Sequence, residues 1–140
     1  MNPTFVVDCS VVTAWCFADE SSPAAERVLQ RMEREWAIVP GLCHLEILNV
    51  LLIAERKKRI SRVQAQRLLT FLAELPIATD AESLPGRLPA ILDLGRSLGV
   101  TSYDAAYIEL AVRLGLPLAT LDRGMRRAAR TAGVPLLIEQ

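Results

Sequence analysis

Short apolar runs alternate along the chain with longer segments in which apolar residues recur at helical spacing. The runs predict short strands at Thr4–Val7, Ala37–Val39, Ile77–Thr79, Leu118–Leu121 and Pro135–Ile138. Strands that alternate with helices favour a parallel sheet covered by helices. We therefore expect an α/β fold with a central, mostly parallel sheet flanked by helices. No repeat or linker divides residues 1–140, so we expect one domain.

Capping residues indicate where the helices begin. Ser10 is the expected cap of the first helix, and Ser22 caps a second one that we expect to run from Pro23 to Trp36. Ser61 and Gln64 have the spacing of a capping box. The other expected helices follow Pro40–Gly41, run from about Arg87 to Leu98, follow Thr101 or Ser102, and run from about Met125 to Ala132.

Four acidic residues occur where this arrangement would bring them together. Asp8 and Asp122 directly follow expected strands, and Asp104 lies in the first turn of a helix. Ligands of parallel sheets bind beyond the carboxyl ends of the strands. Helix capping alone would explain any one of these aspartates. It does not explain Glu46, whose unpaired carboxylate in an apolar helix would cost on the order of several kcal/mol.

A shared divalent cation would satisfy all four acids. Their carboxylates, with the hydroxyls of Ser10 and Thr120, are the hard oxygen ligands that Mg²⁺ and Mn²⁺ prefer. His44 is the only histidine, and the three cysteines lack paired C-x-x-C spacing, so a zinc site is not indicated. A bound cation of this kind can activate water and stabilise charge on a phosphate.

The charge composition limits how nucleic acid could be bound. Lys plus Arg and Asp plus Glu number 16 each, so any contact with nucleic acid must come from a local patch. There are two candidate patches, Arg56, Lys57, Lys58, Arg59 and Arg62, and Arg123, Arg126, Arg127 and Arg130. The first is typical of a solvated helix end. The second could equally be solvated or contact phosphates beside the acids.

Several features favour a cytoplasmic protein that does not enter a membrane. The odd number of cysteines suits reduced thiols, and no secretion signal is recognisable. The most apolar run, Leu42 to Ala54, is shorter than a membrane span and contains His44, Glu46 and Asn49.

Several segments resemble one protein family in their order along the chain. They are Val7–Val11, Trp15–Glu20, Pro40 with Glu46 and Asn49, Thr101–Tyr107, and Pro117–Asp122. Together they resemble the PIN-domain nucleases and, within them, the VapC-type toxins of bacterial and archaeal toxin–antitoxin pairs. The resemblance implies a PIN fold, an endoribonuclease activity that depends on Mg²⁺ or Mn²⁺, a homodimer, and a cognate VapB-like antitoxin that blocks the site.

The resemblance also implies a role for each residue. The metal-binding and catalytic acids would be Asp8, Glu46, Asp104 and Asp122, and the supporting polar positions would be Ser10, Asn49 and Thr120. We expect Asp8 and Asp104 to hold the principal ion. Glu46 and Asp122 would hold a second ion or orient its waters. Trp15 and Tyr107 are interpreted first as core residues and His44 as a packed or capping residue.

Two other functions are compatible with a small α/β domain. A phosphotransfer receiver domain also binds Mg²⁺ through aspartates at strand ends, but it would need an acidic pair after the first strand and a late lysine. Here Cys9 follows Asp8, and the only lysines are Lys57 and Lys58. A non-catalytic module could use the acids to attract a basic peptide. Metal-dependent cleavage of RNA would distinguish the enzyme from both.

Overall fold

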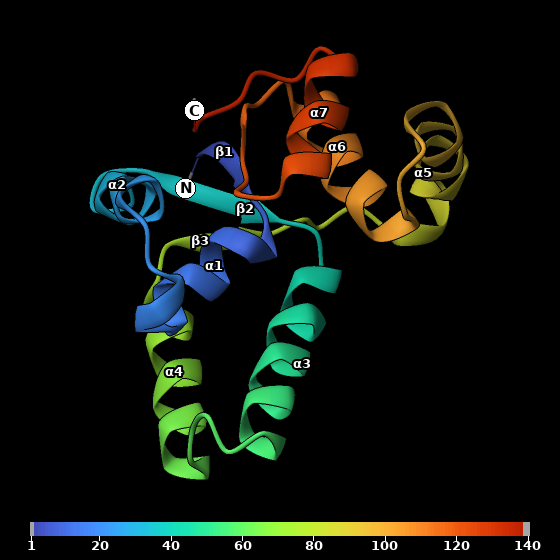
Figure 1. Cartoon of the computed structure of the whole chain (residues 1–140). Helices are drawn as coiled ribbons and strands as arrows, with labels where there is room; N and C mark the ends of the chain where they lie inside the picture. The colour runs from blue at the N-terminus through green and yellow to red at the C-terminus, as the bar shows by residue number, and fades with distance from the viewer. Residues whose placement is uncertain (1, 139–140) are drawn as a thin grey trace.

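Four parallel strands form the centre of the computed structural model, which describes residues 2–138 (Figure 1). The strands are β1 (Pro3–Val7), β2 (Trp36–Val39), β3 (Ile77–Thr79) and β4 (Leu118–Ala119). Their order in the sheet is β3-β2-β1-β4, and every pair of neighbours is parallel. The expected α/β class with a central parallel sheet is confirmed. The carboxyl ends of β1 and β4 are adjacent, which brings Asp8 beside Thr120.

Helices cover both faces of this sheet. They are α1 (Cys9–Cys16), α2 (Pro23–Arg31), α3 (Leu42–Arg56), α4 (Arg62–Glu74), α5 (Leu84–Leu98), α6 (Ser102–Leu114) and α7 (Arg123–Thr131), with a short 3-10 helix at Ala18–Glu20. Figure 1 shows α1, α3 and α4 on one side of the strands and α6 and α7 on the other. The helices α3 and α4 form a hairpin that extends away from the sheet.

The core is built around β1 and α6. Phe5, Val6 and Val7 of β1 have no exposed surface, as expected for a strand with neighbours on both edges and helices on both faces. Helix α6 is buried from Ala105 to Ala111. That stretch includes Glu109, which is only 4% exposed and therefore needs a charged partner.

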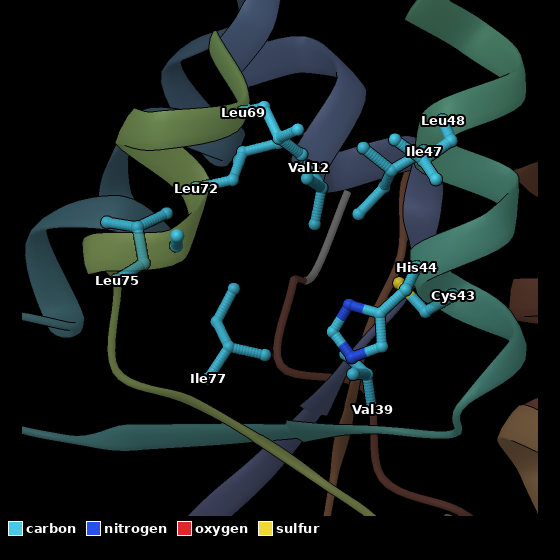
Figure 2. A pocket seen from close by; sticks show the side chains of 11 residues that line it. Val12, Val39, Cys43, His44, Ile47, Leu48, Leu69, Leu72, Leu75 and Ile77 are labelled. Carbon is cyan, nitrogen blue, oxygen red and sulfur yellow. The ribbon is translucent and has the colours of Figure 1, made fainter. Parts of the chain in front are cut away.

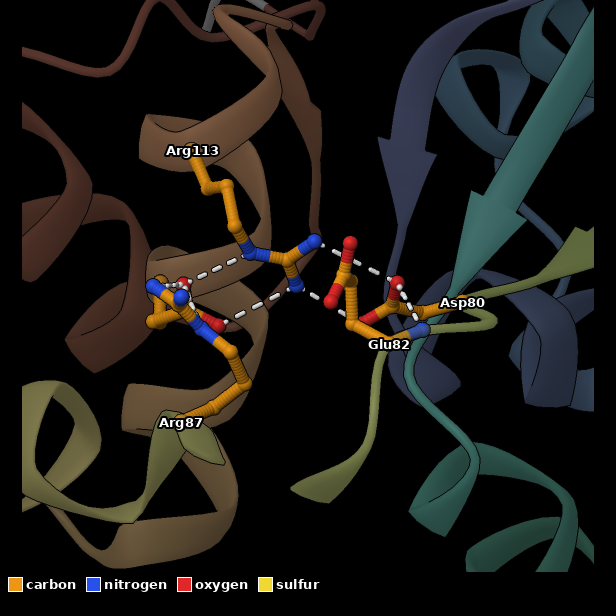
Figure 3. Close-up of polar contacts among 5 residues, drawn as sticks. Asp80, Glu82, Arg87 and Arg113 are labelled. Atoms are coloured by element: carbon orange, nitrogen blue, oxygen red, sulfur yellow. Dashed lines mark hydrogen bonds and ion pairs between the residues drawn. The ribbon is translucent and has the colours of Figure 1, made fainter. Parts of the chain in front are cut away.

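Two arginines are the ion-pair partners of Glu109, and Figure 3 shows Arg113 and Arg87 with the polar contacts around them. Arg113 and Arg87 each approach its carboxylate to 2.9 Å, and Arg113 also contacts Asp80, just after β3, at 2.6 Å. Burial raises the pKa of Glu109, but the hydrogen bonds and charges of the two arginines outweigh it and hold that pKa below its usual value. This ion-pair cluster joins α5, α6 and the end of β3.

Two predicted boundaries in the first part of the chain were wrong. Asp8, not Ser10, caps α1, because Asp8 has extended backbone and its carboxylate accepts a hydrogen bond from the Ser10 amide at 3.0 Å. Helix α2 ends at Arg31 rather than Trp36, because a turn follows Met32 and Trp36 pairs with Pro3 as the first residue of β2.

Other boundaries also differ from the prediction. Helix α5 begins at Leu84 rather than Arg87, with a proline in its first turn, where a missing N–H costs nothing. Strand β4 ends at Ala119, so Leu121 lies outside it and Asp122 does not directly follow a strand. The expected strand at Pro135–Ile138 is a single bridge from Leu136 to Leu118, since β4 is only two residues long. The last helix begins at Arg123 and ends at Thr131.

Several end signals were predicted correctly. Ser61 and Gln64 form both hydrogen bonds of a capping box at the start of α4. Gly99 and Gly115 end α5 and α6 with φ of 65° and 66°, a conformation that glycine adopts without steric cost.

All three cysteines are free thiols. Among the helices in residues 2–138, none has the length and apolar character needed to cross a membrane.

Candidate functional site

Asp8 is the most deeply buried of the four predicted acids, with 4% of its surface exposed. It follows β1 and accepts hydrogen bonds from the amide and hydroxyl of Ser10 and from the hydroxyl of Thr120. Burial raises the pKa of Asp8 to about 6, although the hydrogen bonds from Ser10 and Thr120 act in the opposite direction. The fold therefore fixes the position of this carboxylate while making its charge costly.

Ser10 and Thr120 also hold the segment between β4 and α7. The Ser10 hydroxyl accepts a hydrogen bond from the Leu121 amide at 2.9 Å, and the Thr120 hydroxyl accepts one from the Asp122 amide at 3.1 Å. The exposed Asp122 then caps α7 by accepting from the Met125 amide at 2.7 Å. The Thr120 hydroxyl thus connects Asp8 to the Asp122 backbone, and the Ser10 hydroxyl connects Asp8 to the Leu121 backbone.

Glu46 enters the same region from α3. It is half-buried, and its carboxylate accepts a hydrogen bond from the Tyr107 hydroxyl at 2.6 Å. Tyr107 itself is 1% exposed and lies one turn after Asp104 on α6. From the sequence we interpreted Tyr107 first as a core residue, and it does lie in the core. Its spacing of three residues from Asp104, which places both on one helix face, was the signal that it also contacts the acids.

Asp104 interacts electrostatically with both Glu46 and Asp122. Burial and, second, the charge of Asp122 raise the pKa of Asp104. Burial and the charge of Asp104 also raise the pKa of Glu46, against the hydrogen bond from Tyr107. Within residues 2–138, the Asp104 carboxylate forms no hydrogen bond, and none of the four acids forms an ion pair with a basic side chain. The cluster therefore concentrates negative charge without compensation from the described residues.

Asn49 is placed differently from the other predicted supporting residues. It follows Glu46 by one turn of α3, but its side chain is exposed and forms no hydrogen bond in the described part of the chain. Ser10 and Thr120, by contrast, contact Asp8 directly.

The donors in this cluster fit a hard divalent cation by their chemistry. They are carboxylate and hydroxyl oxygens, with no imidazole or thiolate among the residues that contact the acids. The side chains of residues 2–138 do not bring three His, Cys, Asp or Glu groups together in the geometry of a metal site. Beside Asp122, an open hollow of about 480 Å³ is lined also by Cys9, Ser10, Thr13 and Leu121.

A separate, apolar pocket of about 360 Å³ lies between α3 and α4 (Figure 2). Its lining comes from both helices, from α1 and from the sheet, and includes Val12, Ile47, Leu69, Leu72 and Ile77. His44 also lines this pocket, where its ring lies 2.7 Å from the Thr79 hydroxyl. As the helical spacing predicts, His44 and Glu46 point in different directions from α3: His44 lines this pocket, and Glu46 contacts Tyr107.

Comparison with known proteins supports the family resemblance. The family model described as PIN domain matches residues 5–131. A relative from Pyrobaculum aerophilum, named Ribonuclease VapC3, is 33% identical over 118 residues, which cover 84% of this chain and 88% of the relative. The crystal structure of PAE2754 from Pyrobaculum aerophilum has the same fold, with a TM-score of 0.69 and 24% identity over 91% of this chain and 87% of that one. The chain belongs to the PIN domain family.

Proposed function

We propose that this protein is a VapC-type endoribonuclease that uses Mg²⁺ or Mn²⁺ to hydrolyse RNA phosphodiester bonds. Membership of the PIN domain family and similarity to a named ribonuclease support the class of reaction. The observation that carries the proposal is the uncompensated acidic cluster, in which the charge of Asp104 disfavours ionisation of Glu46 and the charge of Asp122 disfavours ionisation of Asp104. A cation would relieve that repulsion.

Different residues of the site would have different roles in binding the ions. Bound divalent ions supply an activated water and stabilise negative charge on the phosphate. Asp8, fixed by Ser10 and Thr120, would hold the principal ion together with Asp104. The four acids need no catalytic histidine, in agreement with the position of His44 in another pocket.

The other two acids would complete the site. Glu46, oriented by the Tyr107 hydroxyl, and Asp122, held at the start of α7, would bind a second ion or orient its waters. Because Tyr107 fixes Glu46 through a single hydrogen bond, we treat Tyr107 as a positioning residue rather than a catalytic one.

The test is cleavage of mixed RNA by the purified protein with Mg²⁺, with Mn²⁺ or with a chelator. Asp8→Asn and Asp104→Asn keep the side-chain shape but remove a metal-binding charge, so each should lower cleavage by at least about a hundredfold, the scale seen when a charge-stabilising group is removed from an active site. Asp93→Asn is the matched control, because Asp93 lies on α5 with 80% of its side chain exposed. Near-normal cleavage by both site variants would reject the proposed site.

We also propose that a small VapB-like antitoxin controls the enzyme and that the chain forms a homodimer. The apolar pocket between α3 and α4 supports a protein partner, since apolar lining favours an apolar segment over RNA. The two helices also expose Leu45, Leu48, Leu52, Ile53, Val63, Leu69 and Phe71. Light scattering that shows only a monomer at micromolar concentration, with no partner recovered from the native operon, would reject this part of the proposal.

A further inference from the structure

Helix α7 has a charge distribution unlike that of the protein as a whole. It contains four arginines and no acidic residue, although the complete chain has equal numbers of basic and acidic residues. Arg123, Arg127 and Arg130 are exposed, and their spacing of four and three residues places them on one face of the helix. Arg126 is separate from them, because it is half-buried and donates to the Ile138 carbonyl at 2.9 Å. We call Arg123, Arg127 and Arg130 the α7 arginine stripe.

The stripe begins at the acidic cluster. Arg123 directly follows Asp122, whose carboxylate caps α7. At a rise of 1.5 Å per residue, Arg127 and Arg130 lie about 6 Å and about 10 Å farther along the helix axis. In Figure 1, α7 stands on the same side of the sheet as α6, which carries Asp104. A chain bound at the acids could therefore continue along α7.

The stripe arginines form no ion pair with the residues that the structure describes, and two of them stand at unfavourable positions in the helix. Arg59, Arg87 and Arg113 each form ion pairs, but the three stripe arginines form none with residues 2–138. Arg123 and Arg127 are four residues apart, and two like charges at that spacing destabilise a helix. A cation in the first turn is also unfavourable for the helix dipole, and Arg123 is the first residue of α7. Arg130 lies in the last turn, where a cation is favourable, but the positions of Arg123 and Arg127 are easier to explain by an anionic ligand.

RNA is the anionic ligand that the neighbouring site would require. Without bound cations the acidic cluster repels phosphates, so RNA that binds in their absence needs basic contacts beside the cluster. We propose that the α7 arginine stripe binds the phosphate backbone of single-stranded RNA as it extends from the acidic cluster. This inference rests on the proposed ribonuclease function. Contacts to phosphates position a strand without reading its bases, so the stripe should act on RNA of any sequence.

The test compares two variants that remove three positive charges each. One changes Arg123, Arg127 and Arg130 to Gln, and the control changes Arg56, Lys57 and Lys58 to Gln. The control residues are also exposed and form no ion pair with residues 2–138. They lie at the carboxyl end of α3, where the chain turns towards α4. Binding of a fluorescein-labelled, mixed-sequence single-stranded RNA is measured by anisotropy in chelator over a range of salt concentrations.

Three lost phosphate contacts should make the slope of log affinity against log salt less negative by about 2, since each contact contributes about 0.7 for single strands. The control should keep the parental slope. A third variant with Lys at the three stripe positions should also keep it, and thermal melts should show that all variants fold. Restoration by Lys would show that charge, rather than folding of α7, accounts for the loss.

Two negative outcomes separate this inference from the proposed function. If the parent cleaves RNA but the stripe and control variants bind it with equal affinity and slope, the stripe has no such role and the ribonuclease proposal stands. If the parent neither binds nor cleaves RNA, both proposals are rejected. Equal loss of binding in the two Gln variants would also overturn the inference, because it would show a dependence on net charge alone.

Discussion

Replacing Asp8 with Asn should stabilise the protein in chelator at neutral pH, although Asp8 belongs to the proposed active site. Burial raises the pKa of Asp8 from 3.8 to about 6. Between about pH 4 and pH 6 the folded protein thus retains a proton that the unfolded chain has released. The free energy of unfolding falls as the pH rises through this window, and the loss persists above it. Asn carries no charge at any pH and avoids the loss.

The size of the effect follows from two opposing contributions. A tenfold change in proton affinity corresponds to about 1.4 kcal/mol, so the change from 3.8 to about 6 sets an upper limit of about 3 kcal/mol. The opposing contribution comes from Thr120, whose hydroxyl donates a hydrogen bond to Asp8. In one orientation of Asn this hydroxyl would face the amide NH₂ instead of an oxygen, and the lost hydrogen bond would cost about 1 kcal/mol. Capping of α1 is preserved, since Asn caps as well as Asp. The net gain should be about 1–2 kcal/mol above about pH 7.

Urea unfolding of parent and Asp8→Asn in chelator, from about pH 4 to pH 8, measures this gain directly. The difference in unfolding free energy should favour the variant increasingly as the pH rises to about 6 and then become constant. Asp93→Asn, at an exposed position, is the control for the substitution itself and is measured over the same pH range. A variant that is less stable at neutral pH, or a difference independent of pH, would refute the account of Asp8 as a carboxylate whose charge the fold disfavours.

Three further predictions concern the rest of the site. Tyr107→Phe removes the hydrogen bond to Glu46, so cleavage should fall about tenfold in kinetic assays. The free energy of unfolding should fall by about 1 kcal/mol, the usual contribution of one hydrogen bond. Gly124→Ala would place a Cβ atom 3.3 Å from the Asp122 carboxylate; cleavage should fall severalfold without a lower melting temperature, because Ala is the better helix former. Mn²⁺ should raise the melting temperature of the parent, by the equivalent of about 2.7 kcal/mol at a hundredfold excess over its Kd. Asp104→Asn should show a much smaller rise, and equal rises in a Mn²⁺ titration would contradict the four-acid site.

The fold class could be predicted because its signals are local. Apolar runs, the Ser61 capping box and the glycines after α5 and α6 each act within a few residues, and the structure retains them. Boundaries that depend on distant partners were less predictable. Trp36 continues a helical pattern in the sequence, but pairing with Pro3 places it in β2. A pairing partner more than 30 residues away leaves no mark in the local pattern.

The residues of the candidate site could be chosen from the sequence, but their network of contacts could not. Asp8, Glu46, Asp104 and Asp122 were selected by residue type and position, and whether they bind metal stays a prediction. Their connections depend on tertiary contacts, such as the hydrogen bond from Tyr107 to Glu46 across 61 positions. The ion-pair cluster around Glu109 was also missed, since its members come from three elements and each resembles an ordinary surface charge in the sequence.

The sheet order has a consequence for when the site can form during translation. Asp8 is made early, but the hydroxyl of Thr120 that holds it comes 112 positions later, on the segment that follows β4. At about 5–20 residues per second, a ribosome needs roughly 6–22 seconds to make that interval. Until then β1 lacks its neighbour β4, and the nascent chain has neither Thr120 nor Asp122. If the protein cleaves RNA as proposed, the ribosome that makes it is not exposed to a completed site while most of the chain is being synthesised.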